Sequence, residues 1–195
     1  MKQTLQRFIS LLAAAAATYA GPPLICHRVE IGSAKSLPWR AVTEWDGTAP
    51  GYDLSRLTAD TLGLLAPGVP LNVRMETLRR AAVYAVKQEG AADQLAMRLL
   101  ARAADSEAAG KPEAAAWFDA GYFAEAMRQM AFVKRYDMLS ASQRREWKWR
   151  PEAPVDGKPW MERAAKLGLK GVEVALAKVM EYREADLKRV SQARP

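Results

Sequence analysis

The sequence predicts an all-α protein, and three observations lead to that prediction. Alanine is frequent throughout the chain and has the highest intrinsic helix propensity. Apolar residues recur at intervals of three and four positions over several long segments, which is the period of one helix face. Alternating runs of β-branched and aromatic residues, which are typical of strands, are missing. We therefore expect antiparallel helical hairpins and no sheet.

The first twenty residues, MKQTLQRFISLLAAAAATYA, have the pattern of a secretory signal peptide. Lys2 and Arg7 give a positive start, residues 8–17 are almost entirely apolar, and Thr18 and Ala20 are small residues at the usual positions before a cleavage point. The apolar run is shorter than the roughly 20 residues that span a bilayer. We expect cleavage after Ala20 and export to the periplasm or the extracellular space. The alternative is an N-terminal anchor helix that is never removed.

Composition limits the kinds of partner. The chain has 195 residues, 29 basic and 22 acidic side chains, and a formal net charge of +7. Its tightest basic pairs, Arg79-Arg80 and Arg144-Arg145, have acids nearby, so we expect a solvated basic surface and no nucleic-acid partner, which would require a concentrated basic face. One cysteine excludes an internal disulfide, so the fold must be held by packing. No segment after residue 20 is apolar enough to cross a membrane.

Residues 21–53 should form an irregular N-terminal arm, because this segment contains four prolines and four glycines. One or two helical turns are expected from Ser36, with Pro38 in the first turn. The rest of the arm should wrap over a helical body.

Residues 54–150 should form that body. Ser55 is the expected cap of a helix to about residue 65, and Asn72 of a helix that Gly90 ends. Two longer helices should follow at about 91–109 and 113–136. Ser140 should cap a shorter helix through residue 147.

Residues 151–159, PEAPVDGKP, should be a linker or surface loop, because three prolines and a glycine fall within nine residues. Residues 160–192 should then form one long C-terminal helix that packs on the body, with fraying beyond 192. Gly168 and Gly171 interrupt its apolar stripe at a cost of roughly 1 kcal/mol each relative to alanine. We expect them to permit the close approach of another helix.

The stretch AAGKPEAAAWFDAGY lies in a helical pair at residues 96–122 that resembles a tetratricopeptide-type hairpin. Gly110 falls at the turn, Ala115 at the helix crossing and Phe118 at a large apolar position. The likeness covers about one repeat, and no second copy at a 34-residue period is visible. The resemblance implies a repeat superhelix, whereas a plain helical bundle is the alternative. The whole chain is also similar to uncharacterised secreted bacterial helical proteins, a likeness that implies no activity.

Cys26 and His27 are the only cysteine and the only histidine, and they are adjacent. Four interpretations stay open: a buried structural thiol, an intermolecular disulfide, a nucleophile activated by the imidazole, or covalent haem attachment at P-L-I-C-H with His27 as axial ligand. The first is favoured, and no cofactor is expected. One histidine and one cysteine supply only half of a zinc shell, and no Walker loop or nucleophile elbow is present.

The acidic pairs of the helices should be ordinary surface charges. They are Asp105 with Glu107, Asp119 with Glu125, and Glu181 with Glu184.

Trp147, Trp149 and Trp160 are candidate partner-binding aromatics. Together they would form a platform for a glycan or a peptide, with Trp147 and Trp149 in an extended segment, because positions two apart on one helix do not share a face. Packing in the core and at its edge is the alternative.

These observations favour an exported helical binding or scaffold protein of the bacterial cell envelope. Its partners would be proteins or peptides, and it would be a monomer or a weak homodimer. The alternative is an enzyme, or a haem or thiol protein, centred on Cys26 and His27. A third class is an assembly protein that dimerises through its C-terminal helix. Fold class alone is a weak guide to function.

Overall fold

The computed structural model describes residues 21–40, 45–150 and 155–192, and over these the protein is all-α, as predicted. The predicted signal, residues 1–20, lies outside the described residues, as does the tail beyond residue 192. Within the described part of the chain there is no strand, and Trp39 and Thr48 form an isolated antiparallel bridge. The helices are η2 Leu54–Arg56, α2 Leu57–Leu64, α3 Leu71–Ala85, α4 Ala91–Ala108, α5 Ala114–Arg135, α6 Ala141–Glu146, α7 Lys158–Lys166 and α8 Val172–Gln192.

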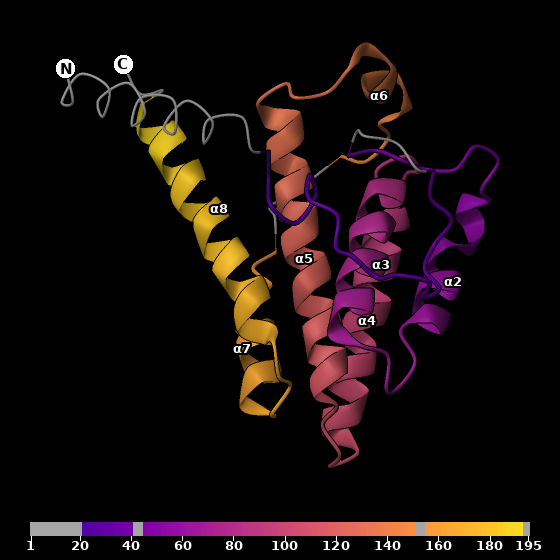
Figure 1. Ribbon diagram of the computed structural model, residues 1–195, viewed down its shortest axis with the longest axis vertical. Coiled ribbons are helices and arrows are strands. Elements are labelled where there is room, and N and C mark those ends of the chain that lie inside the picture. Colours follow the sequence, from indigo (N-terminus) through magenta and orange to yellow (C-terminus); the bar gives the residue numbers. More distant parts are fainter. Residues whose placement is uncertain (1–20, 41–44, 151–154, 193–195) are drawn as a thin grey trace, which may run out of the picture.

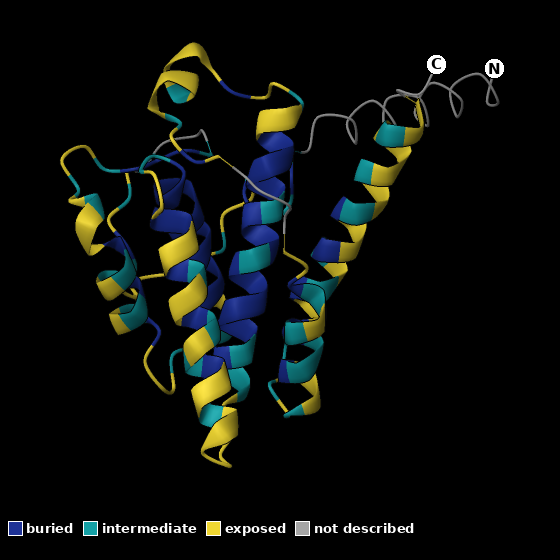
Figure 2. Ribbon diagram, turned by 180° about the vertical axis from the view of Figure 1, so that it is seen from behind, coloured by how far each residue is buried: buried dark blue, intermediate teal, exposed yellow. Residues whose placement is uncertain are grey.

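Helix α5 lies at the centre of the fold (Figure 1). It contacts α3 and α4 on one side and α7 and α8 on the other, while α2 packs against α3 and α4. The short helix α6 lies at one end, where the chain crosses from α5 towards α7 (Figure 1). Buried residues are concentrated along the inner helices, and α4 and α8 expose their outer faces (Figure 2).

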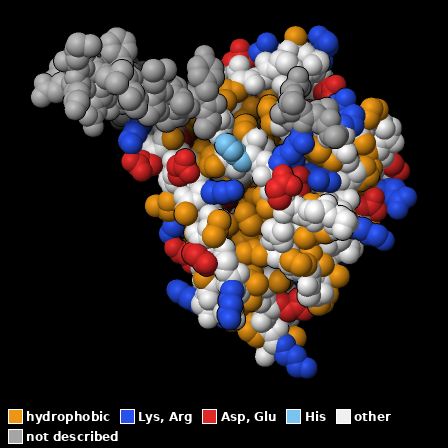
Figure 3. Space-filling model, in the orientation of Figure 1, with side chains coloured by type: hydrophobic (Ala, Val, Ile, Leu, Met, Phe, Trp, Pro, Cys, Tyr) orange, Lys and Arg blue, Asp and Glu red, His pale blue; other side chains and the backbone are white. Residues whose placement is uncertain are grey.

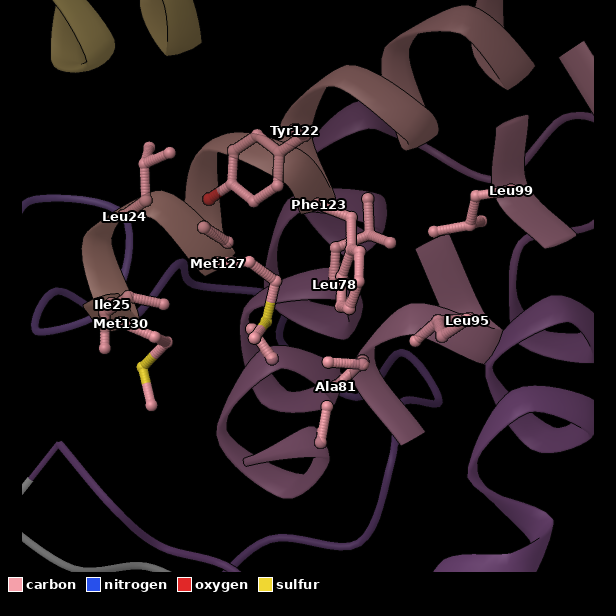
Figure 4. Packing of buried hydrophobic residues seen from close by; sticks show 14 of the residues in the cluster. Leu24, Ile25, Leu78, Ala81, Leu95, Leu99, Tyr122, Phe123, Met127 and Met130 are labelled. Atoms are coloured by element: carbon pink, nitrogen blue, oxygen red, sulfur yellow. The ribbon is translucent and has the colours of Figure 1, made fainter. Parts of the chain in front are cut away.

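One hydrophobic core joins the arm, the body and the C-terminal helices. Phe123 of α5 lies beside Leu78 of α3, with Leu95 of α4 on the other side (Figure 4). Leu24 and Ile25 of the arm lie near the opposite face of α5 (Figure 4). Because residues from both ends of the described chain enter this core, the arm is part of the domain.

Over its described residues the arm is irregular, as predicted. Side chains of helix α3 hold the arm mainly by hydrogen bonds to the backbone of the arm. The helical turns expected from Ser36 are not formed over the described residues 36–40, where the chain is extended towards the Trp39 bridge. A polar face of α3 instead donates to arm carbonyls: Asn72 to Glu30 (2.9 Å), Arg79 to Ile25 (3.1 Å) and Trp45 (3.2 Å), Arg80 to Leu37 (2.7 Å), and the Tyr84 hydroxyl to Pro38 (2.6 Å).

A buried ion pair underlies this polar face. Glu76 and Arg79 are 1% and 0% exposed, and two guanidinium nitrogens of Arg79 donate to the two Glu76 carboxylate oxygens at 2.7 and 2.8 Å. Arg80 donates to the same carboxylate at 2.8 Å, and so does the backbone N–H of Val29 at 3.1 Å. The solvated basic surface expected at Arg79 is therefore wrong, since this guanidinium is an internal donor. A buried charge is tolerated when it is paired and hydrogen-bonded.

The predicted single C-terminal helix is divided into α7 and α8. Gly168 and Gly171 have φ of +91° and +85°, a backbone region that glycine adopts easily and that ends a helix. No atom lies within 4 Å of a Cβ built on Gly168, so this glycine makes a turn rather than the close helix contact that was expected. A Cβ on Gly171 would lie 3.1 Å from Leu71 Cδ2 of α3, so Gly171 does approach another helix. Helix α7 also begins inside the expected linker, with Pro159 in its first turn.

Two predicted helix caps are wrong and one is confirmed. Asp53, not Ser55, caps the first helical segment and accepts from the Ser55 backbone N–H at 3.0 Å. Helix α3 begins one residue before Asn72, whose side chain is free to bind the arm. Ser140 forms a capping box with Gln143 at the start of α6, as its position predicted.

Candidate functional site

An apolar groove lies between α4 and α5 and has a volume of about 290 Å³. The facing sides of the two helices carry alanines, whose small side chains do not fill the space between the helices. Phe123 and Met127 line the groove from α5, and Met97, which is 65% exposed, lies at its edge. Its other lining residues are Ala92, Asp93, Ala96, Leu100, Ala120, Ala124, Arg128, Trp149, Val155 and Trp160.

Two of the three predicted aromatics, Trp149 and Trp160, lie in this groove. Helix α6 ends at Glu146 rather than at residue 147, and residues 147–150 have no regular secondary structure. The backbone N–H of Trp149 donates to the Val86 carbonyl at 3.0 Å. The Trp149 carbonyl accepts from Lys134 Nζ at 3.1 Å. Trp149 is therefore fixed by hydrogen bonds from α3 and α5 before any ligand binds.

Trp160 reaches the groove from the first turn of α7. The start of α7 lies close against α5, where Gly157 contacts Gly121. A Cβ built on Gly121 would lie 2.7 Å from the carbonyl oxygen of Gly157 and 2.9 Å from the backbone nitrogen of Met161. Only glycine at residue 121 permits the two backbones to approach this closely. Gly121 thus makes the close helix contact that was expected of Gly168.

Trp147 does not line the groove. Its ring contacts Trp149 with centroids 6.2 Å apart, and its indole N–H donates to the Trp149 carbonyl at 2.8 Å. Lys134 Nζ lies 5.7 Å from the centre of the Trp147 ring. Trp147 thus supports Trp149 from outside the groove, and the three tryptophans do not form one platform.

Cys26 and His27 occupy different environments. Cys26 is partly buried beside Gly21, and burial raises the pKa of its thiol to about 11, although the charge of Arg79 opposes the shift. His27 is exposed and lines a separate groove between the arm, α5 and α8. A raised pKa leaves little thiolate at neutral pH, which disfavours Cys26 as a nucleophile. Among the described residues, no three His, Cys, Asp or Glu side chains are grouped to hold a metal ion.

The surface positions predicted for Asp119 and Glu125 are wrong, because both are 0% exposed. Asp119 accepts from Arg74 at 2.5 Å; burial raises its pKa to about 7, against the charge of Arg74. Glu125 accepts from the Gly157 backbone N–H and from Arg183, each at 2.8 Å. This carboxylate therefore connects α5 to the start of α7 and to α8.

The sequence contains a signal for these buried acids. Residues 114–133 hold only three charged side chains, so helix α5 is apolar on all faces, which is typical of a buried helix. A charge in such a helix must be buried and therefore paired.

A polar cavity of about 310 Å³ lies between the arm, α3 and α6. The ammonium of Lys87 dominates it and contacts Thr48 Oγ1 at 2.6 Å, Asp46 at 3.0 Å and Glu146 at 2.7 Å. Three donors thus meet three acceptors of the chain itself. This cluster joins the arm to α6 and is the weaker candidate for a ligand.

No protein-family model matches the chain, and searches of curated proteins and of solved structures also found no match. No helix within the described ranges has the length and apolar character needed to span a membrane. Function must therefore be inferred from the groove and its residues.

Proposed function

We propose that the chain is an exported helical binding module of the bacterial cell envelope, and that the groove between α4 and α5 takes an apolar side chain of a partner protein or peptide. The observation that carries this proposal is that Trp149 and Trp160, from two different segments, both line an alanine-rich groove. Tryptophans fixed around an apolar recess are frequent anchors of protein recognition. Export rests on the signal-like pattern of residues 1–20.

The dimensions favour a side chain over a large ligand. A volume of about 290 Å³ is at the lower end of the roughly 300–1,000 Å³ typical of small-molecule pockets. Met97 and Met127 line the groove, and methionine adapts to apolar partners of different shape. Asp93 and Arg128 place charges of both signs beside it, which suits the polar backbone of a peptide. The likeness of the α4–α5 pair to a tetratricopeptide-type hairpin stays a prediction.

Selection of short random peptides on the whole chain, followed by titration of the selected peptides, tests the binding site. Ala124→Leu fills the groove, and Trp160→Ala removes one wall, so each should weaken binding at least tenfold. Trp117→Ala is the matched control, because Trp117 bonds Glu107 outside the groove at 3.0 Å; it should change affinity less than twofold. Equal binding by all three variants would reject the groove as the site.

Export has a separate test. N-terminal sequencing of the protein recovered from fractionated cells should begin at Gly21 and place the protein outside the cytoplasm. A visible spectrum and non-reducing electrophoresis of that preparation test the alternative centred on Cys26 and His27. A haem band or a disulfide-linked species would favour the alternative, and light scattering would reveal a stable dimer.

A further inference from the structure

A second and larger groove lies between the arm, α5 and α8, with a volume of about 830 Å³. It opens where α8 is angled away from α5 (Figure 1). Figure 3 shows the side chain of the chain's single histidine at this surface, beside apolar side chains. This groove shares no lining residue with the groove of Trp149 and Trp160, so a ligand bound here would be independent of the proposed function.

The floor of this groove is aromatic. Phe132 and Tyr136 of α5 have ring centroids 4.4 Å apart, and Tyr182 of α8 meets Phe132 edge-on at 5.4 Å. The guanidinium of Arg189 lies 5.3 Å from the centre of the Phe132 ring and 5.7 Å from that of Tyr136. Phe132 and Tyr182 are each only 4% exposed, so they form the base of the floor. Tyr136, Met138 and Pro23 supply more of its apolar surface, with a cation above the rings.

The rim contributed by α8 is cationic. Lys178, Lys188 and Arg189 line the groove, whereas Glu181 is the one acid among its lining residues. Lys188 also pairs with the exposed Glu184 at 2.8 Å, so a bound anion would share this ammonium with Glu184. The face that α8 presents extends from Lys178 to Gln192, which is about 21 Å at 1.5 Å per residue. The groove therefore combines an extended apolar floor with positive charge along one wall.

The sequence of α8 keeps this groove open. Val172, Ala175, Val179 and Tyr182 are buried at the three- and four-residue spacing of a core-facing stripe. The next positions of that stripe are Asp186 and Arg189, which are polar. They contact α5 through the Tyr136 hydroxyl, which donates to Asp186 at 3.3 Å, and through the Phe132 ring below Arg189, so apolar packing of the stripe on α5 ends at Tyr182. A second copy related by a two-fold axis would add a second set of the same three cations to the interface, whereas an anionic ligand would neutralise them.

We propose that this groove binds an anionic amphiphile, with an acyl chain along the Phe132, Tyr136 and Tyr182 floor and its acidic head group at Lys188 and Arg189. The floor accounts for the chain, and the cationic rim accounts for the charge. A carboxylate and a phosphate monoester share the required chemistry, because both accept charge-assisted hydrogen bonds from lysine and arginine.

The test uses the whole chain and three probes with the same acyl group: palmitate, palmitoyl lysophosphatidate and uncharged monopalmitoyl glycerol. The affinity of each probe is measured by displacement of a bound fluorescent fatty acid, with every lipid kept below its own micellar concentration. Both anions should bind more tightly than the neutral lipid, and added salt should reduce that preference. The tighter of the two anions identifies the head group.

Two variants locate the site. The double replacement Lys188→Gln with Arg189→Gln should weaken anion binding about four- to twentyfold, since an exposed ion pair contributes roughly two- to fivefold. Lys166→Gln with Lys170→Gln removes the same charge outside the groove and should leave binding unchanged. Ala185→Trp places a bulky ring in the groove and should abolish the binding of all three probes.

Three results would overturn the proposal. The first is no binding below the micellar concentration, and the second is equal affinity for the neutral lipid with no effect of the Lys188 and Arg189 change. The third is exclusive binding of haemin, with an absorption band that His27→Ala removes, which would identify a porphyrin site instead.

Discussion

Replacement of Gly121 by alanine should raise the helix propensity of α5 but crowd its contact with the start of α7, and these two effects on stability are opposite in sign. Gly121 has no positive φ, so alanine meets no backbone strain, and intrinsic helix propensity alone would stabilise the variant by about 1 kcal/mol. Packing acts in the opposite direction. The added Cβ would lie 2.7 Å from both the Gly157 carbonyl oxygen and Met161 Cγ, and 2.9 Å from the Met161 backbone nitrogen.

Two of those three atoms belong to the backbone, so they cannot move by a simple change of rotamer. Overpacking of a tight core contact costs about 1–3 kcal/mol. Movement of Gly157 would also weaken its N–H bond to the buried Glu125 carboxylate, a bond worth about 1 kcal/mol. After subtraction of the propensity gain, overpacking alone should lower the free energy of unfolding of Gly121→Ala by about 0–2 kcal/mol, and any weakening of the bond to Glu125 adds to this loss.

Urea unfolding followed by circular dichroism measures this change through the transition midpoint at an unchanged slope. Gly63→Ala is the matched control, because Gly63 is an exposed residue of α2 and no atom lies within 4 Å of its added Cβ. It should raise the free energy of unfolding by about 0.5–1 kcal/mol. Stabilisation of both variants by similar amounts would refute the close approach of α5 and α7.

Three further predictions concern buried polar groups. Burial raises the pKa of Glu76, but hydrogen bonds and charge from Arg79 and Arg80 outweigh burial and hold the pKa below its usual value. The stability that this carboxylate contributes above the usual carboxyl pKa is therefore lost as the pH falls through the lowered pKa of the folded protein, and Glu76→Gln should cost about 3 kcal/mol at pH 7 and flatten the urea midpoints measured between pH 5 and 3. Arg183→Gln leaves Glu125 short of a partner and should cost about 1–3 kcal/mol, whereas adding Glu125→Gln should recover part of the loss in a double-mutant cycle; simple additivity would contradict this coupling. The Cys26 thiol, with a pKa of about 11, should react with iodoacetamide more slowly in the native protein than in urea between pH 7 and 9, and equal rates would show that burial does not protect it.

Much of the fold could be predicted because helix signals are local. The hairpin turn at Gly110, with φ of +69°, and the cap at Ser140 depend on residues a few positions apart. The break in the C-terminal helix was also encoded, since Gly168 and Gly171 interrupt its apolar stripe. Whether such glycines end a helix or admit a neighbour depends on the tertiary packing, so that outcome could not be read from spacing alone.

The candidate site was only partly predictable for the same reason. The sequence predicted only that Trp147 and Trp149 would need an extended segment to share a platform, and both residues do lie beyond the end of α6. That Trp160 lines the same groove as Trp149 depends on the Gly121–Gly157 contact, which joins residues far apart in the chain. The burial of Asp119 and Glu125 was predictable in principle, because the helix around them has almost no other charge.

The way in which α3 binds the arm affects how the sequence can change over evolution. The arm is recognised through main-chain carbonyls at Glu30, Leu37 and Pro38, and any residue type supplies such a carbonyl. Substitutions at the exposed residues Glu30 and Pro38 can accumulate so long as the backbone keeps its path, whereas Leu37 is also part of the core and each donor on α3 is a specific side chain. The order Asn-x3-Glu-x2-Arg-Arg-x3-Tyr over residues 72–84 should therefore outlast the arm as the family diverges. A search for distant relatives would do better to begin from that pattern than from the Cys-His pair.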